Sequence, residues 1–339
     1  MQDMNKTELL ALSWFLWGVS YYLYYPLISI YAIQFITTNE LPTLYISYSV
    51  LGMLMPLIGY KISKRIGIVK SIILGMALGG MGLILMGLAV NMETLFISYS
   101  LSSTVFISLP NYYSYMSNLG KGVISKVWAF SILPSLFSPF VGGEVATIFS
   151  LRYVFIIAGL FNILASLPIT RLEDIKVMDD NGSLISRKVL IPYVVIIPIS
   201  LSFPYVFLEV KDVYNLDYTE IGLLATIAEI LGAVLTLLSS YKKGFLPLFL
   251  FLFSLTYLLY LNPLFAIFFG NWEAIIPTSL EDSNAKSTRD FAVINSLQQS
   301  AWLVGYLISL SLSSPKLSLL SSSIISLFLA LSLKYFRRV

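Results

Sequence analysis

Residues 43–91 read TLYISYSVLGMLMPLIGYKISKRIGIVKSIILGMALGGMGLILMGLAVN, two long apolar runs on either side of a short basic segment. Each run, 43–62 and 71–91, holds about 20 predominantly apolar residues, the length that an α-helix needs to cross a bilayer. The segment between them contains Lys64, Arg65 and Lys70. This pattern predicts two membrane-spanning helices joined by a short charged loop.

The same pattern repeats along the whole chain. Charged or turn-forming residues separate twelve apolar runs, and we expect each run to form one helix. Because twelve crossings of about 20 residues use about 240 of the 339 residues, the connecting loops must be short. The expected helices are 9–36, 43–62, 71–91, 94–117, 127–149, 152–171, 190–210, 219–240, 245–261, 263–280, 291–313 and 316–335.

The composition is that of a chain solvated by lipid. Hydrophobic residues make up 57% and charged residues 12% of the sequence, and the mean hydropathy is +0.83. The absence of cysteine and histidine excludes disulfides, thiolate chemistry, the usual zinc and haem sites, and Ser-His or Cys-His catalytic pairs. A net charge of +3 leaves no basic patch for nucleic acid. We therefore expect no enzyme activity, no cofactor, no metal and no nucleic-acid partner.

The positive charges predict the orientation in the membrane. With a cytoplasmic N-terminus, 18 of the 21 Lys and Arg residues fall on cytoplasmic segments, and only Arg152, Lys211 and Lys316 fall outside. We therefore expect a multi-pass protein of the plasma membrane with both termini in the cytoplasm. The longest hydrophilic stretch, 172–189, is predicted to be a cytoplasmic linker between the six-helix bundles 1–171 and 190–339.

The two predicted bundles show a weak internal repeat. A shift of 178 residues places Pro26 on Pro204 and Lys64 on Lys242, so that a proline-containing helix leads to a basic inner loop in both halves. Internal repeats are typical of alternating-access carriers. The predicted fold class is thus an all-α polytopic membrane protein, with twelve transmembrane helices arranged as two six-helix pseudo-repeats.

The basic loop resembles the loop signature of the major facilitator superfamily, which has a glycine, an acid–base pair, a second glycine and further basic residues. The matching positions are Gly59, Lys64, Arg65 and Gly67. Gly59 is displaced by one position, and Lys64 stands where the family has an aspartate. The resemblance implies that these residues act at the inner gate. The basic side chains are equally typical of topology anchors at anionic lipid.

A second stretch, SPFVGG at 138–143, resembles the Gly-Pro-x-x-Gly-Gly motif of the family's drug and metabolite proton antiporter branch. The following LRYVF at 151–155 resembles the Trp-Arg-x-x-Phe stretch that opens helix 6 of the family. Together the resemblances cover essentially the whole chain. Small residues permit close helix approach, and proline bends a helix, so Pro139, Gly142 and Gly143 are predicted to form a tight contact between the halves. Its role is packing or gating.

Three glutamates, Glu144, Glu229 and Glu273, lie inside predicted helices and away from their ends. An ionisable group in hydrocarbon is costly unless it faces a partner or water. A carboxyl group that is buried in one access state and wetted in the other can bind and release a proton. With no histidine present, we predict that these three couple transport to protons. The alternative is a packing role, which for Glu144 includes an ion pair with Arg152.

Glu229 lies on a stripe of polar and small residues in an otherwise leucine-rich helix. Gly222, Thr226, Ala233 and Thr236 share this stripe at helical spacing. We expect the stripe to face inward, away from lipid.

Aromatic and amide side chains are the predicted solute contacts, although aromatics also serve packing and membrane interfaces. Such a wall suits a neutral or cationic organic molecule. The predicted helices 9–36, 94–117, 190–210 and 263–280 contain no arginine, which argues against phosphates and dicarboxylates. The candidates are Tyr21, Tyr25, Asn111, Asn271, Trp272, Gln299 and Trp302.

The sequence therefore predicts a secondary active transporter that moves a small organic solute by alternating access. Efflux in exchange for protons is the favoured mode, and proton symport or facilitated uptake of a sugar or metabolite is the alternative. A transport-inactive membrane sensor or scaffold is a third reading. The expected partners are a small-molecule solute, protons and the lipid bilayer, and the chain is expected to act as a monomer.

Overall fold

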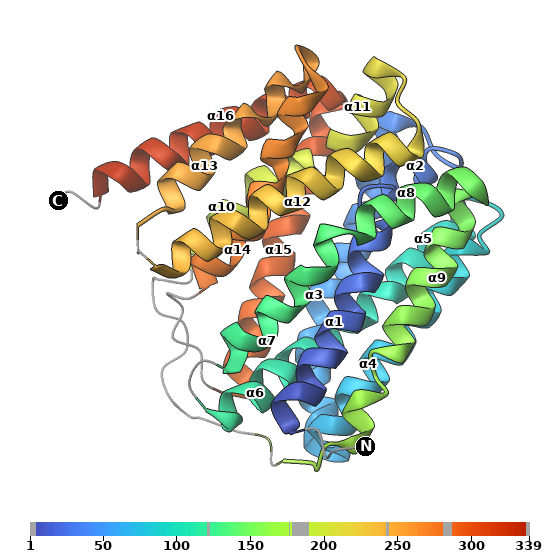
Figure 1. The fold of residues 1–339 in the computed structure, drawn as a ribbon, viewed down its shortest axis with the longest axis vertical. Coiled ribbons are helices and arrows are strands. Elements are labelled where there is room, and N and C mark those ends of the chain that lie inside the picture. Colours follow the sequence, from blue (N-terminus) through green and yellow to red (C-terminus); the bar gives the residue numbers. More distant parts are fainter. Residues whose placement is uncertain are drawn as a thin grey trace.

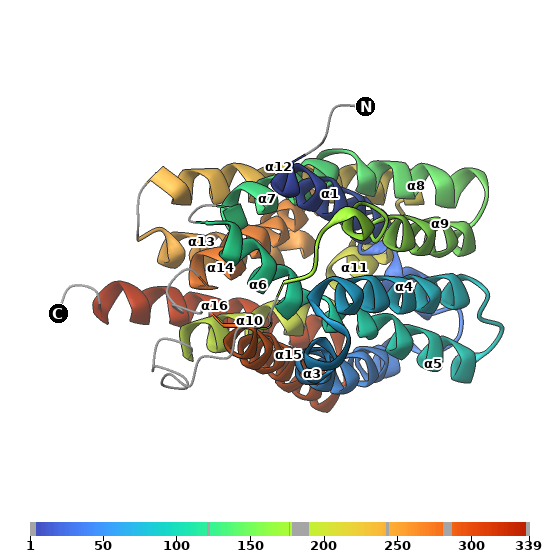
Figure 2. The same cartoon turned by 90° about the horizontal axis from the view of Figure 1, so that it is seen from below.

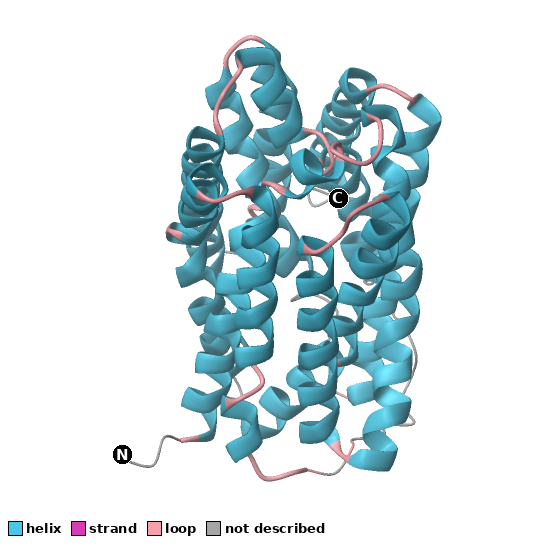
Figure 3. Cartoon of the chain, turned by 90° about the vertical axis from the view of Figure 1, so that its right-hand side faces the viewer, coloured by secondary structure: helices cyan, strands magenta, loops and turns pink. Residues whose placement is uncertain are grey.

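A computed structural model of the chain describes residues 5–120, 123–175, 177, 190–241, 244–280 and 287–336. The described residues form helices and no strands, as Figure 3 shows. Most of the predicted linker, 178–189, lies outside the described residues.

The first half of the chain supplies a set of tilted helices, several of them continued by short 3₁₀ segments (η). These are α1 (Lys6–Tyr24), α2 (Ile28–Ala32), η1 (Thr38–Glu40), α3 (Leu41–Ile66), α4 (Ile68–Gly87), α5 (Met92–Ser102), η2 (Ser103–Ile107), α6 (Leu109–Leu119), α7 (Val123–Ile132), η3 (Leu133–Leu136), α8 (Ser138–Ile148), α9 (Leu151–Leu164) and η4 (Pro168–Arg171).

The second half is built in the same way. Its elements are α10 (Leu190–Ser202), α11 (Val206–Tyr214), α12 (Tyr218–Tyr241), α13 (Leu246–Ser254), η6 (Leu255–Tyr260), η7 (Pro263–Asn271), α14 (Trp272–Leu280), α15 (Thr288–Leu312) and α16 (Pro315–Phe336).

Each of the twelve predicted apolar runs is helical, but several runs are broken. Pro26 falls in the break between α1 and α2, and Phe130–Leu136 meets Ser138–Ile148 at a bend of 43°. Proline removes a backbone donor and clashes with the preceding turn, which explains such breaks. Among the described residues, seven helices, or eight if the bent pair counts as one span, are long and apolar enough to cross a membrane.

The helices of the first half, blue to green in Figure 1, gather on one side of the molecule, and those of the second half, yellow to red, gather on the other. Figure 2 shows the same separation end-on. The two groups meet mainly where α3 packs on α15 and α8 packs on α12, and α6 also contacts α15.

The surface of α12 shows how the sequence sets the rotation of a helix. Gly222, Thr226, Glu229 and Ala233 are buried in the protein. The large apolar side chains between them are exposed: Leu223, Ile227, Ile230 and Val234. The prediction that this stripe faces inward is therefore confirmed.

Candidate functional site

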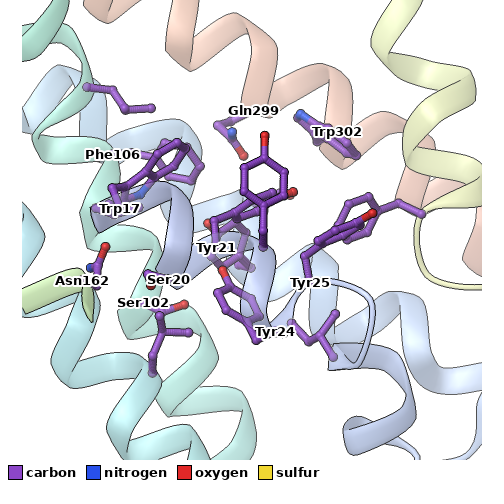
Figure 4. Close-up of a pocket in the computed structure, with 18 of the residues that line it drawn as sticks. Trp17, Ser20, Tyr21, Tyr24, Tyr25, Ser102, Phe106, Asn162, Gln299 and Trp302 are labelled. Carbon is purple, nitrogen blue, oxygen red and sulfur yellow. The ribbon is translucent and has the colours of Figure 1, made fainter. Parts of the chain in front are cut away.

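A cavity of about 200 Å³ lies between helices of the two halves (Figure 4). Its wall is aromatic, and α1 contributes the largest share. Among the described residues that line it, Glu273 is the one charged side chain. The aromatic lining residues are Trp17, Tyr21, Tyr22, Tyr24, Tyr25, Tyr48, Tyr99, Phe106, Trp128, Phe203, Trp272, Trp302 and Tyr306.

One face of α1 forms a stack of rings along the cavity. The ring centroids of Trp17 and Tyr21 lie 5.8 Å apart, and those of Tyr21 and Tyr25 lie 5.6 Å apart, both in stacked geometry. A spacing of four residues places side chains on one face of a helix, so the sequence dictates this stack. The Trp272 ring of α14 meets it edge-on, 6.0 Å from the Tyr21 ring.

Two of the three predicted glutamates lie at this wall. Glu273 lines the cavity and accepts a hydrogen bond from the Tyr22 hydroxyl group. Glu229 lies behind the wall residues Tyr25 and Trp272. Its Oε1 accepts hydrogen bonds from the Tyr25 hydroxyl group and, at 3.1 Å, from Trp272 Nε1. The two carboxyl residues are 3% and 0% exposed, respectively. Burial of this degree requires such partners.

The two glutamates are close because α12 packs tightly against η7 and the start of α14. Gly232 lies against the backbone carbonyl of Gly270, and Thr236 donates a hydrogen bond of 3.0 Å to the carbonyl of Glu273. Oε2 of Glu229 has no hydrogen-bond partner among the described residues. This oxygen remains open to a proton, which would turn it into a donor.

Glu144 is placed elsewhere. It is half-buried on α8 and is not among the described residues that line the cavity. The ion pairs between described residues do not include Glu144 with Arg152. Arg152 instead donates to the carbonyl of Ala89 at 3.5 Å. A proton-coupling role for Glu144 stays a prediction.

The structure brings together five of the seven predicted solute contacts. The lining residues include Tyr21, Tyr25, Trp272, Gln299 and Trp302. Asn111 and Asn271 are fully buried and lie outside the described wall. Their amide nitrogens donate to carbonyls of their own chain segments, those of Ile107 and Phe268.

Sequence reasoning missed a polar part of the wall. Ser20 of α1, Ser102 of α5 and Asn162 of α9 all line the cavity. Asn162 stands alone in the apolar run FIIAGLFNILA at 155–165, and an isolated amide in such a run is the signal that would have identified it. Tyr22 was also missed, because its partner Glu273 is 251 residues away.

The predicted small-residue contact joins α8 to both α1 and α12. Gly142 lies against the carbonyl of Leu23, and Gly143 lies against the carbonyl of Tyr218. The backbone N–H of Phe140, next to Pro139, donates to Thr226 Oγ1 at 3.0 Å. The contact therefore links the two halves, and its gating role stays a prediction.

The basic loop closes a tight turn between α3 and α4. Gly67 has φ +95°, in the region that favours glycine, and Gly59 packs against the backbone of Ile107. Lys64 and Arg65 are exposed, and the Lys64 ammonium lies 4.6 Å from the centre of the Tyr60 ring.

An acidic group reaches this turn from another part of the chain. Asp174 Oδ1 accepts a hydrogen bond of 3.1 Å from the backbone N–H of Val69, at the start of α4. Its neighbour Glu173 binds Lys6 at 2.8 Å, and this hydrogen bond lowers the pKa of Glu173. A carboxylate from more than a hundred residues later in the chain thus bonds to the backbone at the start of α4.

No known family model matches the sequence, and no curated protein is significantly similar to it. The fold, however, is similar to that of an auto-inhibited POT family peptide transporter, with a TM-score of 0.74 at 10% identity, over 98% of this chain and 96% of that one. It is also similar to the human organic anion transporter MFSD10 (TETRAN), with a TM-score of 0.71 at 12% identity, over 96% and 98% of the two chains. The chain therefore shares its overall fold with these two membrane transporters.

Proposed function

We propose that this chain exports a small neutral or cationic organic solute across the plasma membrane by alternating access, in exchange for protons. Its twelve helical runs cross the membrane as two six-helix bundles, 1–171 and 190–339, joined by the linker 172–189. Both termini lie in the cytoplasm, and the chain acts as a monomer. The shared transporter fold supports transport, and the charge bias of the loops supports the orientation.

One observation carries this proposal: each buried carboxyl group is hydrogen-bonded to a tyrosine of the opposite half. Tyr22 belongs to α1 and Tyr25 directly follows its last residue, whereas Glu273 and Glu229 belong to α14 and α12. Movement of one half against the other must break these bonds. The carboxyl groups would then meet water and exchange protons, which links the access state to protonation.

The same residues link protonation to the solute. Tyr22, Tyr25 and Glu273 line the cavity, so a bound molecule contacts the hydrogen bonds that hold the two halves together. A cationic solute and a proton both neutralise a carboxylate, and they therefore compete for it. Competition of this kind is the requirement for exchange.

The wall favours a neutral or cationic solute over an anion. Lys and Arg are absent from the described lining residues, and an anion needs fixed cationic donors. Aromatic faces together with a carboxyl group suit an ammonium on an apolar body. MFSD10 is named as an organic anion transporter, whereas the described wall of this cavity has no cationic side chain to bind an anion.

Two contacts are the proposed gates. The contact of α8 with α1 and α12 at Pro139, Gly142 and Gly143 closes the outer side, and the basic loop at Gly59–Gly67 belongs to the inner side. Asp174 stabilises that loop through the start of α4.

The test is lumenal pH in proteoliposomes that hold an imposed pH gradient, while lipophilic cations, sugars and amino acids are added in turn. A lipophilic cation should dissipate the gradient, and Glu229→Gln or Glu273→Gln should abolish this effect. Glu209→Gln is the matched control, because Glu209 also accepts a tyrosine bond, 2.6 Å from Tyr260, but lies outside the described wall.

Unchanged coupling in Glu229→Gln would overturn the proton assignment. Proton flux in the direction of the solute would establish symport, the alternative mode. Binding of a ligand without any exchange would identify a sensor.

A further inference from the structure

The cavity has a polar side pocket inside the first half of the chain. We define this side pocket by Trp17, Ser20, Ser102, Phe106 and Asn162, which all line the cavity. Figure 4 shows them on one side of the Tyr21 ring, whereas Tyr25 and Trp302 lie on the other side.

Asn162 presents a hydrogen-bonding group that the protein leaves unused. Its side chain is 2% exposed, and Nδ2 donates to the carbonyl of Met76 at 2.9 Å. That bond fixes the orientation of the amide. Oδ1 accepts no hydrogen bond from a described residue, although a buried amide oxygen normally has a partner.

Ser20 and Ser102 add further hydrogen-bonding groups to the side pocket. The Ser20 hydroxyl, 1% exposed, makes no hydrogen bond with a described residue. The Ser102 hydroxyl donates to the carbonyl of Tyr99 at 2.6 Å, and its lone pairs remain able to accept. Three neutral polar groups thus converge on one pocket.

A glycine permits the close helix contact behind the pocket. A Cβ atom at Gly79 of α4 would lie 3.1 Å from Asn162 Nδ2 and 3.1 Å from the carbonyl oxygen of Ser102. Any larger residue at this position would crowd the Asn162 amide. The close approach of α4 to α5 and α9 therefore positions the polar groups.

We propose that the side pocket binds an uncharged hydrogen-bonding group of the solute, a hydroxyl or a carboxamide, and that Asn162 determines specificity for it. This inference rests on the proposed function and names its substrate class. The pocket suits an uncharged group because all three of its polar side chains are neutral, and burial of an unpaired charge costs far more than burial of a dipole.

The aromatic stack sets the size of the solute. The side pocket lies at the Trp17 end of the stack. At the other end, the Tyr25 ring contacts the ring of Trp272, which donates a hydrogen bond to Glu229. Eight residues of helix separate Trp17 from Tyr25, a rise of about 12 Å. The substrate class is therefore an elongated aromatic amine, with its ammonium toward the carboxyl groups and a hydroxyl or carboxamide at the far end.

A matched pair of probes tests this inference: a biphenyl that carries an aminomethyl group at one end and a carboxamide at the other, and its analogue with isopropyl in place of the carboxamide. Equilibrium binding to the purified protein and dissipation of the pH gradient are measured for both. Wild type should bind the carboxamide about tenfold more tightly, because one good hydrogen bond has this effect. Asn162→Leu should lose the preference and still bind the isopropyl probe.

Ser20→Ala supplies a second variant in case Asn162→Leu does not fold, and it should reduce the preference severalfold. Ser98→Ala is the control, because Ser98 is equally buried, at 2% exposure, but lies outside the described wall. Equal binding of both probes by wild type, or a preference that survives in both variants, would overturn the inference. Binding with the expected preference but without any effect on the gradient would instead overturn the proposed function alone.

Discussion

Gly222→Ala tests whether the contact between α8 and α12 opens during transport. The added Cβ atom would meet the carbonyl of Pro139 and would lie 3.1 Å from Cα of Phe140 and 3.2 Å from Cα of Gly143. Carbon atoms pack favourably at about 3.5–4.0 Å, and backbone atoms cannot rotate away as a side-chain tip can. The two helices must therefore separate slightly at this point.

This overlap raises the free energy only of the state in which α8 and α12 touch, which is the state closed to the outside. Overpacking of this kind costs about 1–3 kcal/mol. A bias of about 1–3 kcal/mol between two states changes their ratio by about 5- to 150-fold. We therefore expect Gly222→Ala to increase the population of the outward-open state at least fivefold.

Cysteine labelling measures that population directly, because the sequence contains no cysteine. Thr226→Cys introduces a thiol at a buried position that contacts Phe140, and an impermeant maleimide is added from outside. The labelling rate should rise at least fivefold when Gly222→Ala is added. Gly80→Ala is the control, because its Cβ would approach the carbonyl oxygen of Gly159 to 2.6 Å within the first half only. Equal rates in the two alanine variants, both confirmed as folded, would refute the gating role.

Three further outcomes follow from single contacts. Tyr25→Phe keeps the stacked ring but removes the hydroxyl that bonds across the halves, so solute-driven proton flux in proteoliposomes should fall roughly tenfold. Asp174→Ala removes the side-chain bond to Val69 and should lower stability by about 1 kcal/mol in thermal or denaturant unfolding. Lys6→Ala should leave unfolding unchanged, because the pair with Glu173 is exposed. In the wild type, the hydrogen bond from Lys6 lowers the pKa of Glu173. The bond is therefore present above that pKa and is lost as the pH falls through it. NMR titration of the Glu173 carboxyl group would follow this change.

The helical character of the apolar runs and the rotation of α12 followed from the sequence because both depend on local patterns. Apolar length gave the helical runs, and the 3.6-residue period placed Glu229 and Thr226 toward the protein. The breaks were less predictable. Pro26 marks one and Pro110 follows the 3₁₀ segment Ser103–Ile107, but Pro56 lies inside the unbroken helix α3, so proline alone does not predict a break.

The pairings within the site did not follow from the sequence, because they depend on how distant helices are arranged. Nothing local indicates that Tyr22 meets Glu273 or that Asp174 reaches Val69. Asn111 illustrates the reverse case. Its amide side chain suggested a solute contact, yet Asn111 is fully buried outside the described wall.

The arrangement of α1 limits how such a protein can change its substrates over evolutionary time. Trp17 and Tyr21 line the cavity without bonding to either carboxyl group, so under the proposed mechanism substitutions there would alter recognition and leave proton coupling intact. Tyr22 and Tyr25 serve both tasks at once, and a change at either position alters recognition and energy coupling together. New specificities should therefore arise at the Trp17 end of the helix, while the opposite end stays fixed.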